Sequence, residues 1–203
     1  MGCDIHLYIE YRSKNNKTNN WNSFGERINP GRNYVLFALM ADVRNYTEKK
    51  ITVLVEPRGM PDDAGHISKR DNLLYITDTQ GDGCVTVETA KKWVESGSST
   101  YVNSIHNDKP TWVTHPDWHT HSWLNVSEYQ SILGTYLELE KKWHVERVEE
   151  HAALVKSKNI QPNSWMYDPP KANIEPEYQA VLASLSKFEE LGFESRIVFW
   201  FDN

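Results

Sequence analysis

The segment DIHLYIEYR, residues 4–12, alternates polar and apolar side chains along its whole length. In an extended chain its apolar residues, beginning with Ile5, fall on one side, while Asp4 and His6 fall on the other. This period of two predicts a half-buried β-strand near the start of the chain. The run RIVFWF, residues 196–201, is rich in β-branched and aromatic residues and predicts a second strand near the end.

The clearest helical pattern lies between these strands, over residues 127–158. Apolar residues recur there at helical spacing with charged residues between them, which predicts one long helix or two helices with a break. Asn125 and Glu128, three positions apart, form a start signal similar to a capping box. Residues 175–191 predict a second amphipathic helix, ended by Gly192.

Local patterns predict shorter elements between the first strand and the long helix: a helix over residues 34–43 capped by Asn33, strands over 51–55 and 73–77, and a helix over 87–94 opened by Thr86. Strands at both ends, with the longest helices late in the chain, favour the α+β class over a regular βαβ succession. We therefore expect a single globular domain over residues 1–203. Its small mixed or antiparallel sheet would include the N- and C-terminal strands and be packed by the long helix and the second, C-terminal helix.

Composition excludes several classes of protein. The 203 residues are 39% hydrophobic and carry a net charge of −6, so one core is feasible and non-specific binding to nucleic acid is disfavoured. Two cysteines are too few for a disulfide scaffold and are expected to be thiols. No run approaches the roughly 20 apolar residues that span a bilayer, and no signal peptide opens the chain, so we expect no membrane partner and an intracellular protein.

Two residue pairs are the strongest candidates for a metal site: Asp4 with His6, and His119 with His121. Alternation along an extended chain predicts that both members of each pair point to one face. Imidazole and carboxylate are ligands of divalent Zn, Mn and Fe, so the pairs together would hold one metal ion with an open position for water. Asp117 is the predicted general base for that water. The alternative is that His6 is a surface strand residue, and that His119 and His121 belong to a packing segment and hydrogen-bond backbone carbonyls.

A second group of residues is cationic and predicts a ligand that carries a phosphate. Arginines lie in or beside turns rich in glycine, proline and asparagine: Arg27, Arg32, Arg44 and Arg58. The planar guanidinium suits phosphate or carboxylate, and glycine lets the backbone approach closely. We take Arg32, Arg44 and Arg58 as the anion-binding set. In the alternative, each arginine pairs with a carboxylate and holds a loop, the expected partners being Asp42, Asp62, Asp63 or Glu26.

Aromatic residues offer a further type of contact. Trp112, Trp118 and Trp123 could stack on a base or a sugar, although large aromatic rings more often build a core. Trp123 and Tyr34 complete the predicted ligand-binding set.

Six short motifs are spread over the chain: MGCDIH at residues 1–6, GRNY at 31–34, ADVRN at 41–45, PRGMP at 57–61, HSWL at 121–124 and FWFDN at 199–203. Together, and in this order, they resemble a family of small uncharacterised proteins of tailed-bacteriophage genomes. Members usually carry His-Ser-His-Ser-Trp where this chain has HTHSW at residues 119–123, a change that keeps both imidazoles. The resemblance implies a phage origin and a setting in the host cytoplasm, and it implies no particular reaction.

These residues lead to two hypotheses from different classes. The first is a phage accessory protein that acts as a metal-dependent hydrolase of a phosphoester or nucleotide-like substrate. The second is a non-catalytic counter-defence protein that binds a host macromolecule, such as a defence protein, or sequesters a signalling nucleotide. A structural or assembly component of the phage is a third possibility, and the sequence leaves open whether the protein is an enzyme.

Overall fold

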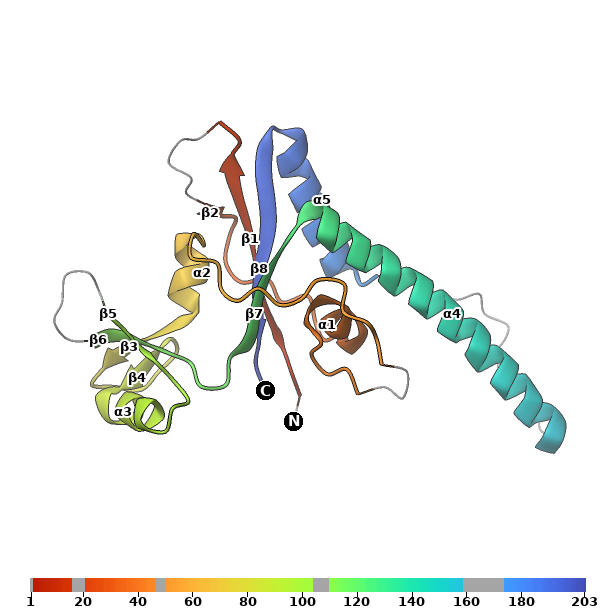
Figure 1. Ribbon diagram of the computed structural model, residues 1–203, viewed down its shortest axis with the longest axis horizontal. Helices are drawn as coiled ribbons and strands as arrows, with labels where there is room; N and C mark the ends of the chain where they lie inside the picture. Colours follow the sequence, from red (N-terminus) through yellow and green to blue (C-terminus); the bar gives the residue numbers. More distant parts are fainter. Residues whose placement is uncertain (1, 16–20, 47–49, 104–109, 159–173) are drawn as a thin grey trace.

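The computed structural model describes residues 2–15, 21–46, 50–103, 110–158 and 174–203. Within these residues the chain forms two four-stranded sheets and five helices (Figure 1). In chain order the elements are β1 (Ile5–Ser13), β2 (Asn22–Ser23), α1 (Tyr34–Ala41), α2 (His66–Asp71), β3 (Leu73–Thr77), β4 (Cys84–Thr86), α3 (Val87–Glu95), β5 (Tyr101–Asn103), β6 (Pro110–Thr114), β7 (His119–Asn125), α4 (Val126–Lys158), α5 (Pro176–Glu190) and β8 (Phe193–Phe201). The α+β class predicted from the sequence is confirmed.

The first sheet has the strand order β2-β1-β8-β7 and is antiparallel throughout. Strands β1 and β8 pair along their full length, from Ile5 opposite Phe201 to Ser13 opposite Phe193. The two predicted terminal strands are therefore neighbours. In this register the alternating apolar residues of both strands share one face of the sheet, and that face can be buried as a unit.

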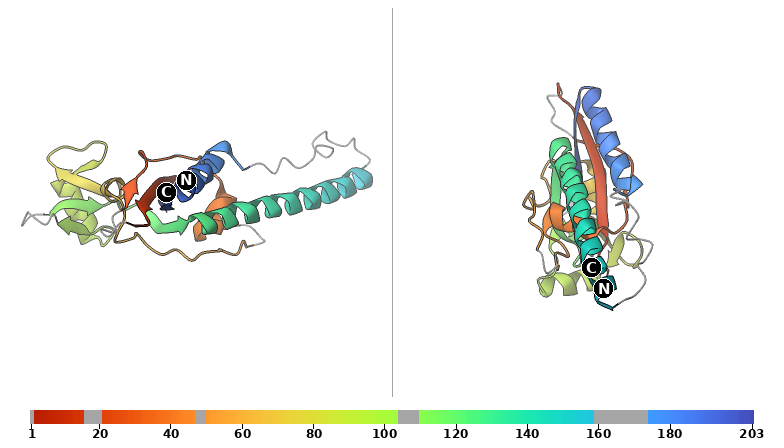
Figure 2. Two further views of the ribbon diagram at one scale, coloured as in Figure 1. Left: turned by 90° about the horizontal axis from the view of Figure 1, so that it is seen from above. Right: turned by 90° about the vertical axis from the view of Figure 1, so that its right-hand side faces the viewer.

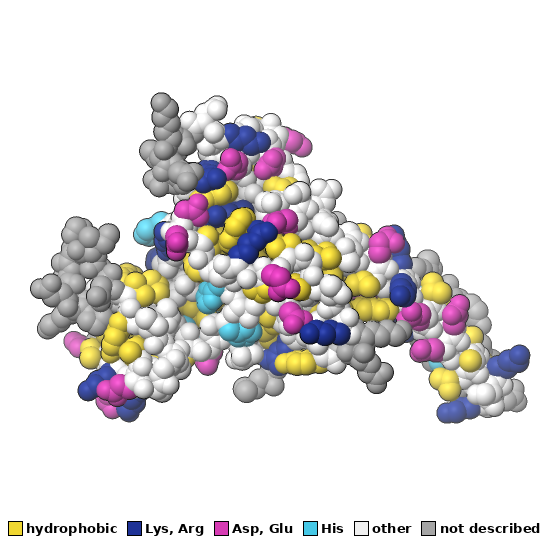
Figure 3. All heavy atoms as spheres, in the orientation of Figure 1, with side chains coloured by type: hydrophobic (Ala, Val, Ile, Leu, Met, Phe, Trp, Pro, Cys, Tyr) yellow, Lys and Arg dark blue, Asp and Glu magenta, His cyan; other side chains and the backbone are white. Residues whose placement is uncertain are grey.

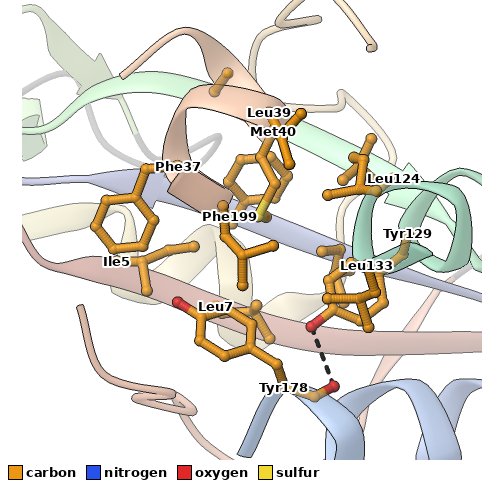
Figure 4. Packing of buried hydrophobic residues seen from close by; sticks show 14 of the residues in the cluster. Ile5, Leu7, Phe37, Leu39, Met40, Leu124, Tyr129, Leu133, Tyr178 and Phe199 are labelled. Atoms are coloured by element: carbon orange, nitrogen blue, oxygen red, sulfur yellow. Dashed lines mark hydrogen bonds between the residues drawn. The ribbon is translucent and has the colours of Figure 1, made fainter. Parts of the chain in front are cut away.

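Helices α1, α4 and α5 cover that apolar face and close the main core (Figure 4). Ile5 and Leu7 of the sheet, Phe37 of α1 and Leu133 of α4 are at most 2% exposed. The hydroxyl of Tyr129 donates to the backbone oxygen of Tyr178 at 3.2 Å, which joins α4 to α5 inside the core. The long helix and the C-terminal helix thus pack the sheet as the apolar pattern predicts.

Helix α4 begins at the predicted signal and continues as one unbroken helix. Asn125 Oδ1 accepts the backbone N–H of Glu128 at 2.9 Å, and the Glu128 carboxylate accepts the backbone N–H of Asn125 at 3.0 Å. Within α4 the buried residues lie near its start: Tyr129, Ile132, Leu133 and Tyr136. At about 1.5 Å per residue the helix is about 50 Å long, and its later part projects from the body, opposite the end that holds the second sheet (Figure 2).

The other face of the first sheet is also covered. Tyr8, Val198 and Trp200 are buried there, against partly buried side chains that include Ile67 of α2 and Trp118. This face carries the polar members of the β1 alternation, so burial of His6 and Glu10 requires hydrogen-bonded partners.

The second sheet was not predicted. Its order is β4-β3-β6-β5, it contains one parallel pair, and it packs with α3 over a small core of Leu74, Val85, Ala90 and Val113. Strand β3 and helix α3, capped by Thr86, match their predicted ranges closely. The three-residue strands β4 and β5 and the six-residue helix α2 carry too few residues for a periodic signal. Strand β6 is as long as β3 and was missed.

One predicted strand is wrong. Residues 51–55 form no strand, because a side chain and a helix satisfy their backbone groups instead. The Asn45 amide accepts the N–H of Ile51 at 3.0 Å and donates to its carbonyl at 2.7 Å, and the N–H of Leu54 bonds the carbonyl of Leu39 in α1. Ile51 and Val55 of this segment join the main core, whereas Leu54 is exposed.

Across the described ranges, none of the helices is both long enough and apolar enough to cross a membrane.

Candidate functional site

Five aromatic rings form an imidazole–indole cluster on the second face of the first sheet. The cluster consists of His6, His115, Trp118, His121 and Trp200. His6 stacks on Trp200 at 5.5 Å between ring centroids and lies 5.3 Å from Trp118. His115 stacks on Trp118 at 4.6 Å, and His121 stacks on Trp200 at 5.5 Å. Residues from β1, β7, β8 and the turn before β7 are therefore brought to one place.

His6 is held at both ring nitrogens. Its Nε2 donates to Oδ2 of Asp202 at 2.9 Å, and its Nδ1 accepts from the guanidinium of Arg27 at 3.1 Å. Because a guanidinium only donates, Nδ1 carries no proton and the ring is neutral. Burial lowers the pKa of His6, while the hydrogen bond that its ring donates to Asp202 opposes that effect. Asp202 also accepts the backbone N–H of Asp4 at 2.9 Å, so its position is fixed.

His121 is neutral for a different reason, because burial disfavours its charged form. Its Nε2 lies 2.6 Å from Oδ1 of Asn72, an acceptor supplied by the end of α2. Burial, together with the nearby rings of His119 and His6, lowers the pKa of His121 to about 4. At neutral pH the cluster therefore presents uncharged imidazoles rather than a concentration of positive charge.

A pocket of about 440 Å³ opens beside the cluster, between the two sheets. We call it the His6 pocket. Its charged lining groups are Arg27, Arg70 and Asp71, and its aromatic lining groups besides His6 are Tyr8, Tyr75, Trp112 and Trp118. Arg70 is engaged by Asp71 at 2.6 Å and by Glu26 at 2.9 Å. For Arg27, by contrast, no carboxylate of the described residues lies within ion-pair distance.

Comparison of the chain with family models, with curated proteins and with solved structures yields no match. The geometry of the described residues is therefore the basis for a functional assignment.

The four predicted metal ligands do not converge. Asp4 forms a two-point ion pair with Arg32, at 2.6 and 2.9 Å, on the protein surface. His6 is bound by Asp202 and Arg27 as described above. In the part of the chain that the structure describes, no three His, Cys, Asp or Glu side chains are grouped so that they could hold a metal ion.

A β-bulge separates His119 from His121, so the expectation that both point to one face is wrong. Thr120 has a left-handed φ of 53°, and the register with β8 shifts between His119 and Ser122. His119 consequently lies opposite Phe201, on the main-core side of the sheet, with 6.2 Å between ring centroids. His121 stacks on Trp200, on the opposite side. The added residue in β7 breaks the alternation on which the predicted pair depends.

The predicted anion-binding arginines are distributed over the molecule. Arg32 pairs with Asp4, and Arg58 lies 4.3 Å above the ring of Trp123 and binds the carboxylate of Glu128. A carboxylate neutralises each of these two guanidinium groups, as in the alternative weighed from the sequence, but the partners are Asp4 and Glu128 rather than the carboxylates expected there. On the face drawn in Figure 3, basic and acidic side chains are likewise interspersed, and histidine side chains lie near the middle of the body.

The remaining predicted residues lie in two places. Arg44, Asp117 and His119 line one further pocket, which is described below. Tyr34 is the first residue of α1, is 42% exposed and contacts Phe37 edge-on at 5.8 Å. The structure therefore unites three predicted residues away from the His6 pocket and leaves Tyr34 outside both pockets.

Sequence reasoning missed part of the His6 pocket. Arg70 and Tyr75 come from α2 and β3, and neither has a local feature that sets it apart from an ordinary surface residue. Arg27 and Trp118 did carry a signal, since the first lies beside a turn and the second belongs to an aromatic-rich run. Their association depends on how the second sheet is placed against β1.

Proposed function

We propose that the protein binds a small ligand that carries both a phosphate and an aromatic ring, such as a nucleotide, in the His6 pocket. One observation carries the proposal: Arg27, which has no carboxylate partner among the described residues, lines the same pocket as the indoles of Trp112 and Trp118. A guanidinium binds phosphate through charge-assisted hydrogen bonds. Indole faces stack on any of the nucleobases, because every base has a π-face.

The charge of the lining supports an anionic ligand. Two arginines face one carboxylate, Asp71, and the hydroxyl of Tyr8 also donates to that carboxylate at 3.2 Å. Because Asp71 and Glu26 both bind Arg70, Arg27 is the guanidinium of the lining that is left to bind an anion. A volume of about 440 Å³ is within the range of pockets that hold small molecules.

His6 positions Arg27 rather than acting on the ligand. The chain of contacts runs from Asp202 through the neutral imidazole to the guanidinium. The guanidinium has five N–H donors, and His6 occupies one of them. Phosphate oxygens can accept from the others without displacing the imidazole.

Binding without turnover agrees best with this arrangement. Both nitrogens of His6 are already hydrogen-bonded, so the ring is not free to accept a proton from water. Arg27 and the indole faces bind and orient a ligand, and they supply no nucleophile. In the setting that the phage resemblance implies, such a protein would sequester a nucleotide in the host cytoplasm. The metal-dependent hydrolase stays a separate prediction, which metal analysis of the purified protein tests.

Isothermal titration calorimetry with nucleoside monophosphates tests the proposal. We expect one of the four common monophosphates to bind at one site, and the matching nucleoside to bind more weakly. Loss of a charge-assisted hydrogen bond costs about 1.5–3 kcal/mol, so Arg27→Ala should weaken binding at least about tenfold. Arg27→Lys should recover part of this loss, because it restores the charge without the planar fork.

Two further variants locate the ligand. Trp112→Ala should weaken binding of both the monophosphate and the nucleoside, since it removes a stacking face. Arg147→Ala is the matched control, because Arg147 lies on the exposed part of α4 and its nearest carboxylate contact is 3.7 Å away. Absence of binding for all four monophosphates, or equal binding by Arg27→Ala and Arg147→Ala, would refute the proposal.

A further inference from the structure

A second pocket of about 400 Å³ lies at the end of the first sheet, where the chain ends meet. We call it the Arg44 pocket. It is formed by the turn after α1, the turn before β7 and the last residue, and its lining includes Arg44, Tyr46, Asp117, His119, Thr120 and Asn203. No part of the proposed nucleotide site is shared with it, because the two pockets have no lining residue in common.

The turn before β7 separates the two pockets. Trp118 lines the His6 pocket, whereas its neighbours Asp117 and His119 line the Arg44 pocket. The C-terminal residues divide in the same way, since Asp202 binds His6 and Asn203 binds Arg44. The Arg44 pocket is therefore a distinct site, separated from the His6 pocket by the turn before β7.

The Arg44 pocket contains one cation and one anion that are not paired with each other. Arg44 donates to the carbonyl of Gly2 at 3.3 Å and to the side-chain oxygen of Asn203 at 3.1 Å, both neutral acceptors. Over the described ranges, no carboxylate lies within ion-pair distance of Arg44 and no cation within that distance of Asp117. The other carboxylate in the lining, Asp42, is bound by Asn45 at 2.7 Å and by Lys50 at 3.6 Å.

His119 adds an unused polar atom. Its Nδ1 lies 2.8 Å from the hydroxyl of Thr120, but its Nε2 is buried and has no hydrogen-bond partner within the described residues. Buried polar atoms are nearly always hydrogen-bonded in folded proteins, and an exception needs an explanation. This nitrogen is closed off from solvent, so a ligand in the pocket reaches it only if the His119 ring turns toward the pocket.

The backbone around the pocket is strained. Throughout the described ranges, the non-glycine residues with a left-handed φ are Asp42 at 57°, Arg44 at 56° and Thr120 at 53°, and all three line this pocket. Asp42 is the left-handed C-cap of α1, a position that aspartate tolerates, whereas this conformation is uncommon for Arg44 and especially for the β-branched Thr120. Such conformations concentrate at ligand sites, where the surrounding structure holds them in place.

We propose that the Arg44 pocket binds a free α-amino acid as its zwitterion. The carboxylate of the amino acid is bound by the guanidinium of Arg44, and its ammonium group by the carboxylate of Asp117. Both charges of the pocket are then neutralised by one small ligand. An anion alone would leave Asp117 unpaired, and a cation alone would leave Arg44 unpaired.

Thermal shift assays with the twenty standard amino acids, followed by calorimetry on those that stabilise the protein, test this proposal. We expect at least one amino acid to bind at one site. Its N-acetyl derivative, which lacks the ammonium charge, should bind at least tenfold more weakly. Asp117→Asn should produce a similar loss for the amino acid and should leave the affinity for the N-acetyl derivative unchanged.

Asp82→Asn is the matched control, because Asp82 is an exposed aspartate in a turn outside both pockets. The proposal is overturned if no amino acid binds, or if Asp117→Asn and Asp82→Asn bind equally well. It is also overturned if inorganic phosphate binds and Asp117→Asn strengthens that binding, since the pocket would then be a simple anion site. Circular dichroism of each variant shows whether it is folded. We expect Asp117→Asn to fold, because it exchanges an exposed side chain for one of equal size.

Discussion

Replacement of Glu10 by Gln should strongly destabilise the protein, because Glu10 and Arg196 form an ion pair inside it. Glu10 is 0% and Arg196 is 4% exposed. One oxygen of Glu10 accepts from the guanidinium of Arg196 at 2.9 Å, and the other accepts from the N–H of Gly65 and the hydroxyl of Ser68, both at 2.6 Å. Gln keeps the shape of Glu10 but removes its charge and turns an N–H group toward one of these donors.

The magnitude follows from what remains around the guanidinium. Loss of one partner of a buried ion pair costs about 3–5 kcal/mol, because the other charge stays out of water. Arg196 would keep its contact with Asp63 at 2.9 Å and its position 3.9 Å from the ring of Trp21. We therefore expect the lower end of that range, about 3 kcal/mol of unfolding free energy.

Urea unfolding followed by tryptophan fluorescence measures this loss. With a denaturant slope of about 3 kcal/mol/M, a loss of about 3 kcal/mol lowers the midpoint by about 1 M. Asp4→Asn is the matched control, since the Asp4 and Arg32 pair has nearly the same distances, 2.6 and 2.9 Å, but lies at the surface. Its midpoint should move far less, because water screens exposed charges.

A double variant separates the ion pair from the shape of the site. Glu10→Leu combined with Arg196→Met removes both charges, so it should be less destabilising than Glu10→Leu alone. The reasoning is refuted if Glu10→Gln and Asp4→Asn shift the midpoint equally, or if the double variant is less stable than either single one.

The remaining predictions concern the metal, a histidine and two glycines. The metal-dependent hydrolase predicted from the sequence requires stoichiometric zinc, manganese or iron, lost on replacement of His119 and His121 by Ala; elemental analysis of the purified protein tests this, and a metal-free protein counts against it. Burial lowers the pKa of His121 from 6.5 to about 4. Between these pH values His121 is protonated in the unfolded chain and neutral in the folded protein. The unfolding free energy should therefore be highest above about pH 6.5 and should fall as the pH is lowered from 6.5 to 4. Urea midpoints measured across that range should depend less on pH in His121→Gln. Gly192, with φ of 86° after α5, should lose about 1–2 kcal/mol of stability on replacement by Ala. Gly134 lies on the open surface of α4, so Gly134→Ala should raise the unfolding free energy by about 0.5–1 kcal/mol. Equal melting temperatures for Gly192→Ala and Gly134→Ala would contradict the left-handed conformation of Gly192 and the helical conformation of Gly134.

The sequence by itself determines the elements whose cause is local. The alternation in β1, the reciprocal caps of Asn125 and Glu128, and the Asn33 cap of α1, whose Oδ1 accepts the N–H of Leu36 at 3.0 Å, all involve residues a few positions apart. Periodicity and capping depend on neighbours along the chain, so the printed sequence contains the information they need. The long helix, both terminal strands and the α+β class follow from these patterns.

The tertiary structure alone decides the sites. His6 and Asp202 are 196 positions apart, and the pocket beside them is lined by residues of β1 together with residues of β3 and β6 from the second sheet. Because of the bulge at Thr120, His119 and His121 lie on opposite faces of the sheet, and no local sequence pattern predicts this bulge. Ile51 does not form the predicted strand, because the Asn45 amide makes hydrogen bonds to its backbone N–H and carbonyl. In each case the deciding free energy comes from contacts between segments that meet only after folding, whereas sequence patterns report the preferences of short stretches before those contacts form.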